Sequence, residues 1–427
     1  MATGQPASPL RCDVLVIGGG NAGLCAALAA REAGASVLLL ESAPRSLRGG
    51  NTRHGRNLRL AHDHPTLWQH GCYTAQDFWG ELVRVTGGVT DAALSHQMIA
   101  ASADAAEWMH HHGARFEQPA RARKTAFLRG GGKALLNAYY LTAERLGVSI
   151  LYDCRATELL MQDGKVERVT VLHDDTHGLV HPHAVVLACG GMQANADWRA
   201  DVWGEDAAQV VIRGAPHADG RLLRHVLDLG AMATGDAKLA HVVAIDARAP
   251  VSDGGIVTRI DGINLGIVVD QHGRRIIDPR GCTGPEQYAI WGGLIAQSPS
   301  KIAYAIHDAN SAAMTRPSIY PPICAPTLDA LAVRLGIDPQ ALASSAEGTT
   351  LCVPPFSGTP MRAGLTFAYL GVRIDATARV QSNLFAAGMA MAGNILGRGY
   401  LAGIGLTIST VFGRIAGQHA ARCAGLW

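Results

Sequence analysis

The start of the chain shows a strand–helix–strand pattern of apolar residues. Residues 13–17 form a short, mostly β-branched or apolar run, which is typical of a buried parallel strand. Residues 21–33 are rich in alanine and lack proline, so they favour a helix that ends at Gly34. Residues 37–40 form a second apolar run. The pattern therefore predicts a βαβ unit.

The turn between the first strand and the helix carries a glycine motif. Gly18, Gly20 and Gly23 match G-x-G-x-x-G, in which the glycines allow a tight turn, approach of a pyrophosphate and close helix–sheet packing, respectively. Glu41 follows the second strand, where an acid can bind a ribose 2′-OH and would repel a 2′-phosphate. The alternative is an ordinary βαβ unit whose glycines only close a turn. Because all parts occur in the expected order, we predict a site for FAD or NAD rather than NADP.

The C-terminal segment contains a matching second half of such a site. Residues 384–417 begin with a strand that reaches Gly388, continue with a glycine-rich loop and end in a long helix from about Gly403. The positive end of that helix would point at an anionic or electron-rich group, such as the pyrimidine end of a flavin. Because the two halves of the site lie at opposite ends of the chain, we predict FAD rather than NAD.

The region between these segments predicts the rest of the fold. Residues 240–355 hold most of the 19 prolines, which punctuate loops, and we interpret them as an inserted domain that caps the cofactor. The fold class is α/β: a Rossmann-like, glutathione-reductase-like FAD-binding domain at residues 1–240 and 356–427, with an inserted α+β capping domain at residues 241–355. The other predicted elements are helices within 61–128 (with a long run at 90–112), 134–146 and 221–229, and strands at 148–154, 156–161, 166–173 and 183–191.

Composition excludes several classes of function. A net charge of +2 gives no general reason to expect nucleic acid binding. The nine cysteines form no C-x-x-C pair, which argues against an iron–sulfur cluster or structural zinc and suits a reducing cytoplasm. His110, His111 and His112 point in different directions around a helix, so we expect no metal. Residues 1–10 do not resemble a signal peptide and the longest apolar run, 401–412, is too short to span a bilayer, so we expect a cytoplasmic protein that could reach a membrane only through a partner.

Six segments together resemble the fumarate reductase/succinate dehydrogenase flavoprotein superfamily, over about residues 11–420: VIGGGNAG, RGGNTRHGRNLR, GGGKALLNAYY, VVLACGGM, GIVVDQHGRR and AAGMAMAGNILGRGYLAGIGLTISTVFGRIAG. Within it the sequence is most similar to the FAD-dependent tricarballylate dehydrogenases. This resemblance implies oxidation of tricarballylate to cis-aconitate, with removal of an α-proton by a base of the cap and hydride transfer to flavin N5. Electrons would pass to a separate membrane-bound iron–sulfur/haem protein.

Other functions remain open at this point. One is a member of the same superfamily with another substrate, such as fumarate or succinate, a 3-ketosteroid, or a precursor in a precorrin-3B synthase-like role. Another is a non-catalytic flavin electron-transfer subunit.

The resemblance also implies roles for individual residues. In this superfamily the active site lies at the junction of the FAD domain and the cap. Arg259 is matched with the proton-shuttle arginine, His241 with an active-site histidine that helps to clamp carboxylates, and Arg398 with the substrate arginine of the C-terminal loop. Tyr369 stands in for a histidine of the fumarate reductases, and Met389 replaces a glutamate.

The covalent-flavin histidine of the succinate dehydrogenases aligns with Asn51, not with His54, so we expect non-covalent FAD. Five arginines crowd residues 45–59, where they could neutralise a flavin phosphate or a polyanionic substrate, or form a solvated basic loop. Arg53 and Arg56 of this loop are the ones we expect to help Arg259 and Arg398 bind a tricarboxylate. The predicted cofactor-binding residues are Gly18, Gly20, Asn21, Ala22, Glu41, Ser42, Gly50, Asn51, Thr52, Arg56, Asn57, Ala156, Gly190, Gly191, Asp219, Gly388, Gly403, Gly405 and Leu406.

Overall fold

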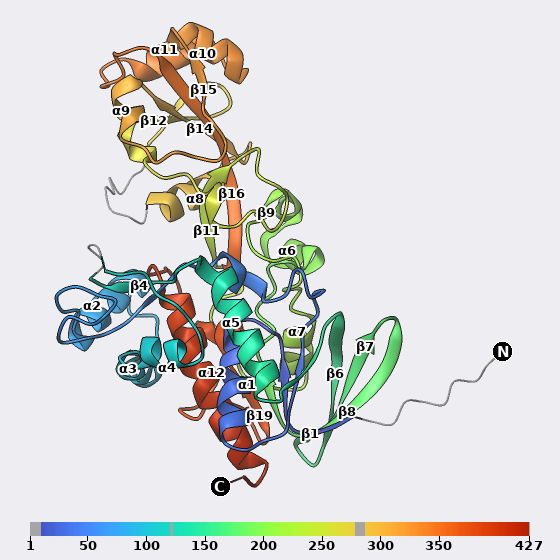
Figure 1. Ribbon diagram of the computed structural model, residues 1–427. Helices are drawn as coiled ribbons and strands as arrows, with labels where there is room; N and C mark the ends of the chain where they lie inside the picture. Colours follow the sequence, from blue (N-terminus) through green and yellow to red (C-terminus); the bar gives the residue numbers. More distant parts are fainter. Residues whose placement is uncertain (1–9, 120–122, 278–286, 427) are drawn as a thin grey trace. The chain divides into compact units, whose positions relative to one another are not determined.

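The computed structural model describes residues 10–119, 123–277 and 287–426 (Figure 1). The expectation about a signal peptide concerns residues 1–10, of which only residue 10 lies within these ranges. Cys282 also lies outside them. The chain divides into two compact units. Unit 1 consists of residues 1–195, 216–240 and 367–427, and unit 2 of residues 196–215 and 241–366.

These boundaries differ from the expected domain boundaries at two places. Residues 196–215 and 356–366 belong to unit 2, although we expected them in the FAD-binding domain. The reason is strand pairing: β9 (Val211–Ile212) runs parallel to β16 (Phe356–Ala368), with Val211 opposite Gly364. Both segments are therefore built into the sheet of unit 2. The role of unit 2 as a cap stays a proposal.

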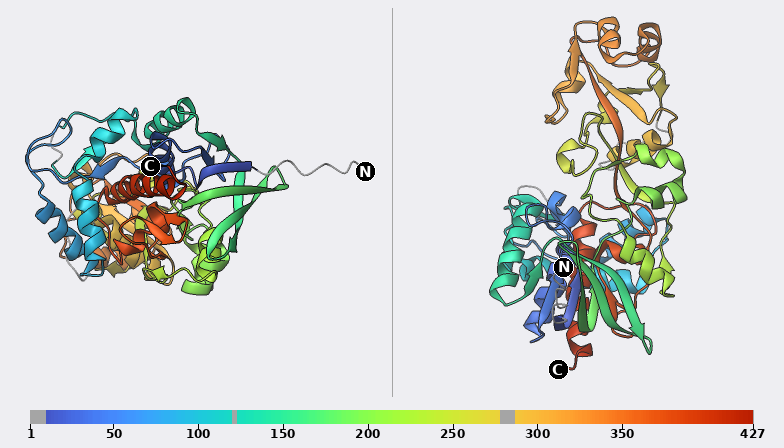
Figure 2. Two further views of the ribbon diagram at one scale, coloured as in Figure 1. Left: turned by 90° about the horizontal axis from the view of Figure 1, so that it is seen from below. Right: turned by 90° about the vertical axis from the view of Figure 1, so that its right-hand side faces the viewer.

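Unit 1 is organised around a mostly parallel sheet of order β18–β19–β8–β1–β2–β5. β1 pairs in parallel with β2 and β8, and β19 extends the parallel set beyond β8. β6 and β7 form an antiparallel extension, seen in green beside blue β1 in Figure 2. The bounds are β1 Leu10–Ile17, β2 Val37–Leu40, β5 Ser149–Leu151, β6 Cys154–Gln162, β7 Lys165–His173, β8 Thr176–Leu187, β18 Arg379–Gln381 and β19 Leu384–Ala386.

The first and last helices pack against each other beside this sheet (Figure 1). α1 (Asn21–Glu32) and α12 (Ile404–Cys423) approach closely through glycines of α12. A Cβ on Gly413 would lie 2.6 Å from the oxygen of Ala22, and one on Gly417 would lie 2.2 Å from that of Ala26. The amide of Asn21 adds a 2.9 Å hydrogen bond to the hydroxyl of Thr410.

The helical stretch expected within residues 61–128 is less continuous than predicted. Residues 61–74 contain no helix, and the run at 90–112 divides into α3 (Ala92–Ala101) and α4 (Ala105–His111). The break occurs at Ser102, whose hydroxyl donates to the oxygen of Ile99 and accepts from the amide of Ala61. The remaining elements of unit 1 are η1 Gly50–His54, β3 Asn57–Arg59, α2 Ala75–Thr86, β4 Thr125–Phe127, α5 Gly131–Arg145, α7 Arg221–Asp228, β10 Ala233–Thr234, β17 Gly371–Val372, η5 Gly388–Ala390 and η6 Ala392–Asn394.

Unit 2 combines an antiparallel sheet with short helices. Its sheet has the order β11–β16–β14–β12–β13, with β9 and β15 also paired to β16. One face is covered by α8, through Trp291 and Ile295, and a second core forms under α10 and α11 around Val269, Leu331 and Leu342. The bounds are α6 Ala196–Trp203, η2 Glu205–Gln209, β11 Ala240–Asp246, η3 Ile256–Thr258, η4 Ile263–Leu265, β12 Ile267–Val269, β13 Arg275–Ile276, α8 Gln287–Gln297, β14 Ile302–His307, α9 Ala309–Ala313, β15 Ile323–Ala325, α10 Leu328–Leu335 and α11 Pro339–Ala346.

Candidate active site

The glycine turn between β1 and α1 has the geometry that a dinucleotide requires. Gly18 has a φ of 109°, and a Cβ there would lie 2.4 Å from the oxygen of Ala188. A Cβ on Gly23 would lie 1.8 Å from the oxygen of Gly18, so only glycine lets the helix begin this close to the strand. A Cβ on Gly20 would lie no nearer than 3.6 Å to its closest neighbours, the oxygen of Gly49 and the hydroxyl of Thr52. The protein around Gly20 would therefore tolerate a side chain, which is consistent with the motif's role for this glycine, the approach of a pyrophosphate to the backbone.

Glu41 is buried at the end of β2 and organises the loop that follows. Its two carboxylate oxygens accept 2.9 Å hydrogen bonds from the amides of Ala43 and Gly49. A carboxylate offers about four acceptor positions, so it can still bind a ribose hydroxyl. Ser42 follows it directly.

Tyr140 of α5 is a neighbour that the sequence did not reveal. Its buried hydroxyl donates a 2.9 Å hydrogen bond to the oxygen of Gly19, where a Cβ would lie 2.0 Å away. Burial raises the pKa of Tyr140, with a smaller contribution from Glu41. Arg48 stacks on the Tyr140 ring at 4.5 Å. Gly19 is thus needed for this tyrosine, although the motif itself only requires glycine at 18, 20 and 23.

The arginine loop meets both α1 and α5. The amide of Asn21 donates to the hydroxyl of Thr52 at 2.9 Å, and a Cβ on Gly132 would lie 1.7 Å from the Thr52 oxygen. Gly50 has a φ of 53° with open space around it, as a backbone that approaches a ligand would need. Arg56 lies over the ring of Phe127, and Asn57 begins β3.

Other predicted cofactor residues come together at the carboxyl end of β8. Gly190, with a φ of 80°, would place a Cβ 3.4 Å from the Cβ of Ala218, next to Asp219. Asp219 itself accepts from the amide of Arg221 at the start of α7. Ala156 lies on β6 at an irregularity of its pairing with β7.

An aromatic cluster, which we define as Phe367, Tyr369 and Tyr400, reaches the start of α12 through Tyr400. A Cβ on Gly388 would lie 2.7 Å from the Cβ of Ala22, so the closing loop abuts α1. A Cβ on Gly405 would lie 3.2 Å from the hydroxyl of Tyr400.

Within the aromatic cluster, Phe367 contacts both tyrosines. The ring of Phe367 lies 5.8 Å from that of Tyr400 and 5.3 Å from that of Tyr369. Tyr369 donates a 2.8 Å hydrogen bond to the oxygen of Gly399, and burial raises its pKa, with a smaller effect of Tyr400. Sequence analysis selected Tyr369 but missed Phe367 and Tyr400; the position of Tyr400 within GRGYLAG was the available signal.

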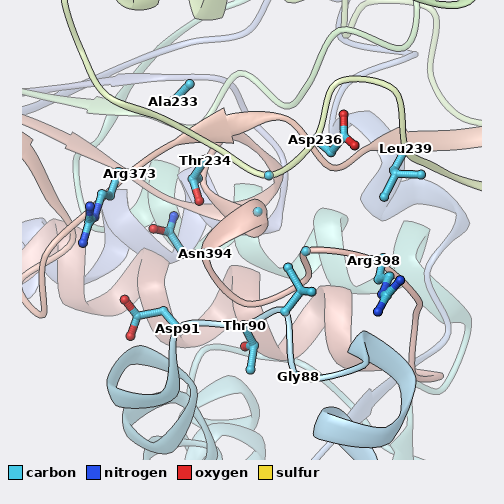
Figure 3. Close-up of a pocket in the computed structure, with 14 residues that line it drawn as sticks. Gly88, Thr90, Asp91, Ala233, Thr234, Asp236, Leu239, Arg373, Asn394 and Arg398 are labelled. Atoms are coloured by element: carbon cyan, nitrogen blue, oxygen red, sulfur yellow. The ribbon is translucent and has the colours of Figure 1, made fainter.

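Arg398 lies in a pocket of about 690 Å³ in unit 1 (Figure 3). Its Nε donates a 2.9 Å hydrogen bond to the oxygen of Thr86 at the end of α2. Figure 3 shows Arg373 and Arg398 at opposite ends of this pocket, with Thr234 and Asn394 between them. Arg398 is therefore placed beside α2, whereas Tyr400 is the side chain that reaches the start of α12.

Unit 2 brings His241 and Arg259 together with Arg213, a residue that sequence analysis did not select. His241 lies on β11 and is 5% exposed; its burial, together with the charges of Arg213 and Arg259, lowers its pKa to about 3. Arg213 is also buried and donates to the oxygen of Gly255 at 3.2 Å and the hydroxyl of Thr366 at 3.1 Å. The ring is therefore uncharged at neutral pH, and the role proposed for His241 toward a carboxylate is that of a hydrogen-bonding group.

Arg259 is held by two neighbours within unit 2. One of its terminal nitrogens lies 2.8 Å from a carboxylate oxygen of Asp261, and the guanidinium lies 4.3 Å from the centre of the Tyr288 ring. Its buried Nε has no hydrogen-bond partner within the described part of the chain. This nitrogen is a donor that a ligand could satisfy.

Comparison with known proteins identifies the family. A family model described as an FAD binding domain matches residues 13–406. The chain belongs to this FAD-binding family. It is 25% identical to digoxin reductase of Eggerthella lenta, over 96% of this chain and 87% of that protein. It is 26% identical to a probable fumarate reductase, Ifc3, of Shewanella frigidimarina, over 96% and 75% of the two chains.

Solved structures share the fold. The open conformation of a flavocytochrome c3 fumarate reductase superposes with a TM-score of 0.79 at 22% identity, covering 98% of this chain and 79% of that one. A 3-ketosteroid-Δ4-(5α)-dehydrogenase from Rhodococcus jostii RHA1 superposes with a TM-score of 0.71 at 22% identity, covering 96% and 97%.

This member of the FAD-binding family is an FAD-dependent oxidoreductase. The proteins that it resembles include fumarate reductases, a digoxin reductase and a 3-ketosteroid dehydrogenase. The cofactor is FAD, and the glycine turn at Gly18, the open backbone at Gly50 and the buried Glu41 fit it. Within the described ranges, no group of three or more His, Cys, Asp or Glu residues is arranged to hold a metal ion. None of the helices there is long and apolar enough to cross a membrane.

Proposed function

We propose that this enzyme dehydrogenates a polycarboxylate, with tricarballylate oxidised to cis-aconitate as the leading reaction. The observation that supports it is the pair of arginines, Arg213 and Arg259, beside the uncharged His241 in unit 2. Tricarballylate carries three negative charges, and an unpaired charge in a site shielded from water is very costly. Guanidinium groups suit carboxylates because they form two parallel hydrogen bonds.

The side chains of unit 2 suggest separate roles. Neutral His241 can donate or accept one hydrogen bond but adds no charge, so the arginines carry the electrostatic binding of carboxylates. Arg259 remains the proposed proton shuttle. Asp261, with a carboxylate oxygen 2.8 Å from a terminal nitrogen of Arg259, holds the guanidinium in place. Bound FAD supplies the acceptor for the hydride.

Unit 1 offers two further contacts for a substrate. Arg398 is the predicted substrate arginine, and the pocket around it also contains Arg373. Tyr400 lies near the start of α12, where its hydroxyl can donate a hydrogen bond to a carbonyl or carboxylate oxygen that gains charge. The hydroxyl of Tyr369 donates to the oxygen of Gly399. Variants of Arg398 and of the tyrosines distinguish these contacts.

A second candidate function is reduction or dehydrogenation of a ring ketone such as a 3-ketosteroid. The aromatic cluster favours it, because an aromatic side chain such as Tyr400 can contact a flat apolar ring while a tyrosine hydroxyl polarises the carbonyl. The relatives include a digoxin reductase and 3-ketosteroid dehydrogenases. The arginines of unit 2 would have no partner on such a substrate, which is why we prefer the polycarboxylate.

We also propose that electrons leave through a separate membrane-bound iron–sulfur/haem protein. The support is the similarity to a quinol fumarate reductase and to a mycobacterial Sdh1 complex, at TM-scores of 0.66 and 0.71. In this arrangement the enzyme would reach the membrane only through that protein.

The decisive experiment is an anaerobic titration of the FAD-loaded enzyme, followed by flavin absorbance. Tricarballylate, succinate and a 3-ketosteroid are added separately. We expect tricarballylate to bleach the flavin band, because hydride transfer reduces it. Bleaching by the steroid alone would replace the leading function with the second candidate, and no bleaching by any of them would favour a non-catalytic electron-transfer subunit.

The role of Arg398 is tested in the same assay. Arg398→Ala should abolish bleaching by tricarballylate without releasing FAD, because it removes a carboxylate contact and not a cofactor contact. Arg373→Ala in the same pocket is the matched control and should keep most of the bleaching. Equal effects of the two changes would show that Arg398 has no special role toward the substrate.

A further inference from the structure

A cluster of ionic groups lies at the start of α12 and has no role in the function proposed above. We call it the Arg59 cluster, and it comprises Arg59, Tyr73, Glu81 and Lys124. Arg59 is 7% exposed and lies 2.5 Å from Glu81 and 2.7 Å from the Tyr73 hydroxyl. The same hydroxyl donates a 2.8 Å hydrogen bond to Glu81, which also pairs with Lys124. The Glu81 pKa is lowered because hydrogen bonds and nearby cations outweigh its burial.

Arg59 connects this cluster to the first turn of α12. Its Nε donates to the oxygen of Ala402 at 3.0 Å. Its backbone amide donates to the hydroxyl of Thr407, which donates in turn to the Arg59 oxygen at 2.6 Å. A Cβ on Gly403 would lie 2.8 Å from the Arg59 amide nitrogen. The side chain of Arg59 thus holds Ala402, and its backbone holds Thr407, so that Arg59 fixes both ends of the segment 402–407.

The part of α12 held in this way is the part predicted to contact FAD. α12 begins after Gly403 with no side-chain cap and no acid in its first turn. The amide of Ile404 donates to the oxygen of Leu401, and the aligned N–H groups of the first turn form the positive end of the helix. A helix start in this place stabilises negative charge, so its exact distance from the flavin favours the reduced cofactor over the oxidised one.

The burial of Arg59 needs such an explanation. Taking a cation out of water costs several kcal/mol before its partners compensate, and an apolar residue is often as stable. Of the five arginines in residues 45–59, Arg59 is the buried one, whereas Arg45 lies exposed beside Glu144 at 3.6 Å. Its guanidinium is shared between a carboxylate, a phenol and the carbonyl that precedes the helix.

We propose that Arg59 is a positioning residue that sets the reduction potential of the bound FAD. It does so by fixing the start of α12, while Glu81, Tyr73 and Lys124 hold its guanidinium in place. The inference depends on FAD binding and not on the identity of the substrate. Its failure would therefore leave the proposed oxidation of tricarballylate unaffected.

The test compares charge-conserving variants, because a change of net charge alone would alter the potential. Arg59→Lys keeps the charge but loses the planar fork that reaches three partners at once. Tyr73→Phe keeps all charges and removes the bridging hydroxyl. Arg414→Lys is the matched control, since Arg414 also lies on α12, ten residues after its first residue. It forms a bidentate pair with Asp104 at 2.9 and 3.0 Å.

The measurement is the midpoint potential of bound FAD, by anaerobic titration against a reference dye, together with FAD affinity from flavin fluorescence. For Arg59→Lys we expect about a tenfold loss of preference for reduced over oxidised FAD, which equals a shift of about 30 mV to lower potential. Tyr73→Phe should shift it in the same direction by less, and Arg414→Lys should leave it unchanged.

Two outcomes would overturn the proposal. One is an unchanged potential in Arg59→Lys or Tyr73→Phe despite lower thermal stability, which indicates a purely structural role. The other is an equal shift in the Arg414→Lys control. If Arg59→Lys does not fold, Tyr73→Phe alone decides, because it removes one oxygen atom from a partly exposed network.

Discussion

At the scale of single residues, the uncharged state of His241 is the feature with the widest consequences. Burial, followed by the charges of Arg213 and Arg259, lowers its pKa to about 3. His241, which the sequence suggested as a carboxylate-binding residue, is thus a neutral hydrogen-bonding group near two cations. The positive charge that a carboxylate would meet in unit 2 comes from the arginines alone.

This depressed pKa predicts an acid-sensitive fold. Below the ordinary histidine value of about 6.5, the unfolded chain binds a proton at His241 that the folded chain does not bind. Stability therefore falls as the pH is lowered from about 6.5 toward 3, by about 1.4 kcal/mol per pH unit for this group. It is unaffected by His241 above pH 7.

The variant His241→Gln should remove that slope. Urea unfolding at pH 7, 5.5 and 4.5 measures it, and the difference between the variant and the unmodified chain cancels the other titrating groups, including His307. Parallel losses of stability in the two proteins would contradict the assignment of a strongly lowered pKa to His241.

Several residues of the candidate site were out of reach of sequence analysis for a common reason. The glycine motif and Glu41 are recognisable because their function depends on local spacing. Arg213, Tyr140 and Arg59 acquire their roles from partners distant in the chain, namely Thr366, Gly19 and Glu81. A single sequence does not show which distant residues meet, so these three looked like ordinary loop or helix residues.

At the scale of elements, the contact between α1 and α12 depends on small residues. Gly413 and Gly417 let the two backbones touch, and both helices begin at predicted FAD-binding residues. A larger side chain at this contact would separate the helices and move both starts.

Gly417→Ala should therefore destabilise the protein by about 1–3 kcal/mol, as overpacking of a core does, and weaken FAD binding. Gly80→Ala is the matched control, because Gly80 lies inside α2 with nothing within 4 Å of its added methyl group. It should stabilise the protein by up to about 1 kcal/mol, since alanine favours helix. Thermal unfolding and FAD titration measure both, and a stable Gly417→Ala variant with normal FAD affinity would refute the close contact.

Element boundaries were predictable where local signals are strong. The strand at residues 37–40 was predicted to the residue, and the final helix starts within one residue of the expected position. The break in the helical run at 90–112 was not predicted, because it depends on a hydrogen bond from the distant Ala61 to Ser102. Local sequence favours helix throughout that run, so only the tertiary contact reveals the interruption.

At the scale of the whole molecule, the fold class was accessible from sequence but the division of the chain was not. The repeated glycine and strand signals at both termini indicate a split FAD-binding domain. The assignment of residues 196–215 to unit 2 depends on the two-residue pairing of β9 with β16. Such a short parallel contact has no hydrophobic pattern of its own.

The contact between the first and last helices also bears on how the protein is made. During synthesis the glycine turn and α1 emerge long before α12, which completes their surroundings, because the contacting residues Asn21 and Thr410 are 389 residues apart in the chain. At roughly 5–20 residues per second, a ribosome needs on the order of tens of seconds to bridge that interval. The nascent N-terminal half therefore waits with an exposed apolar helix face, and cofactor uptake is expected only after α12 has emerged.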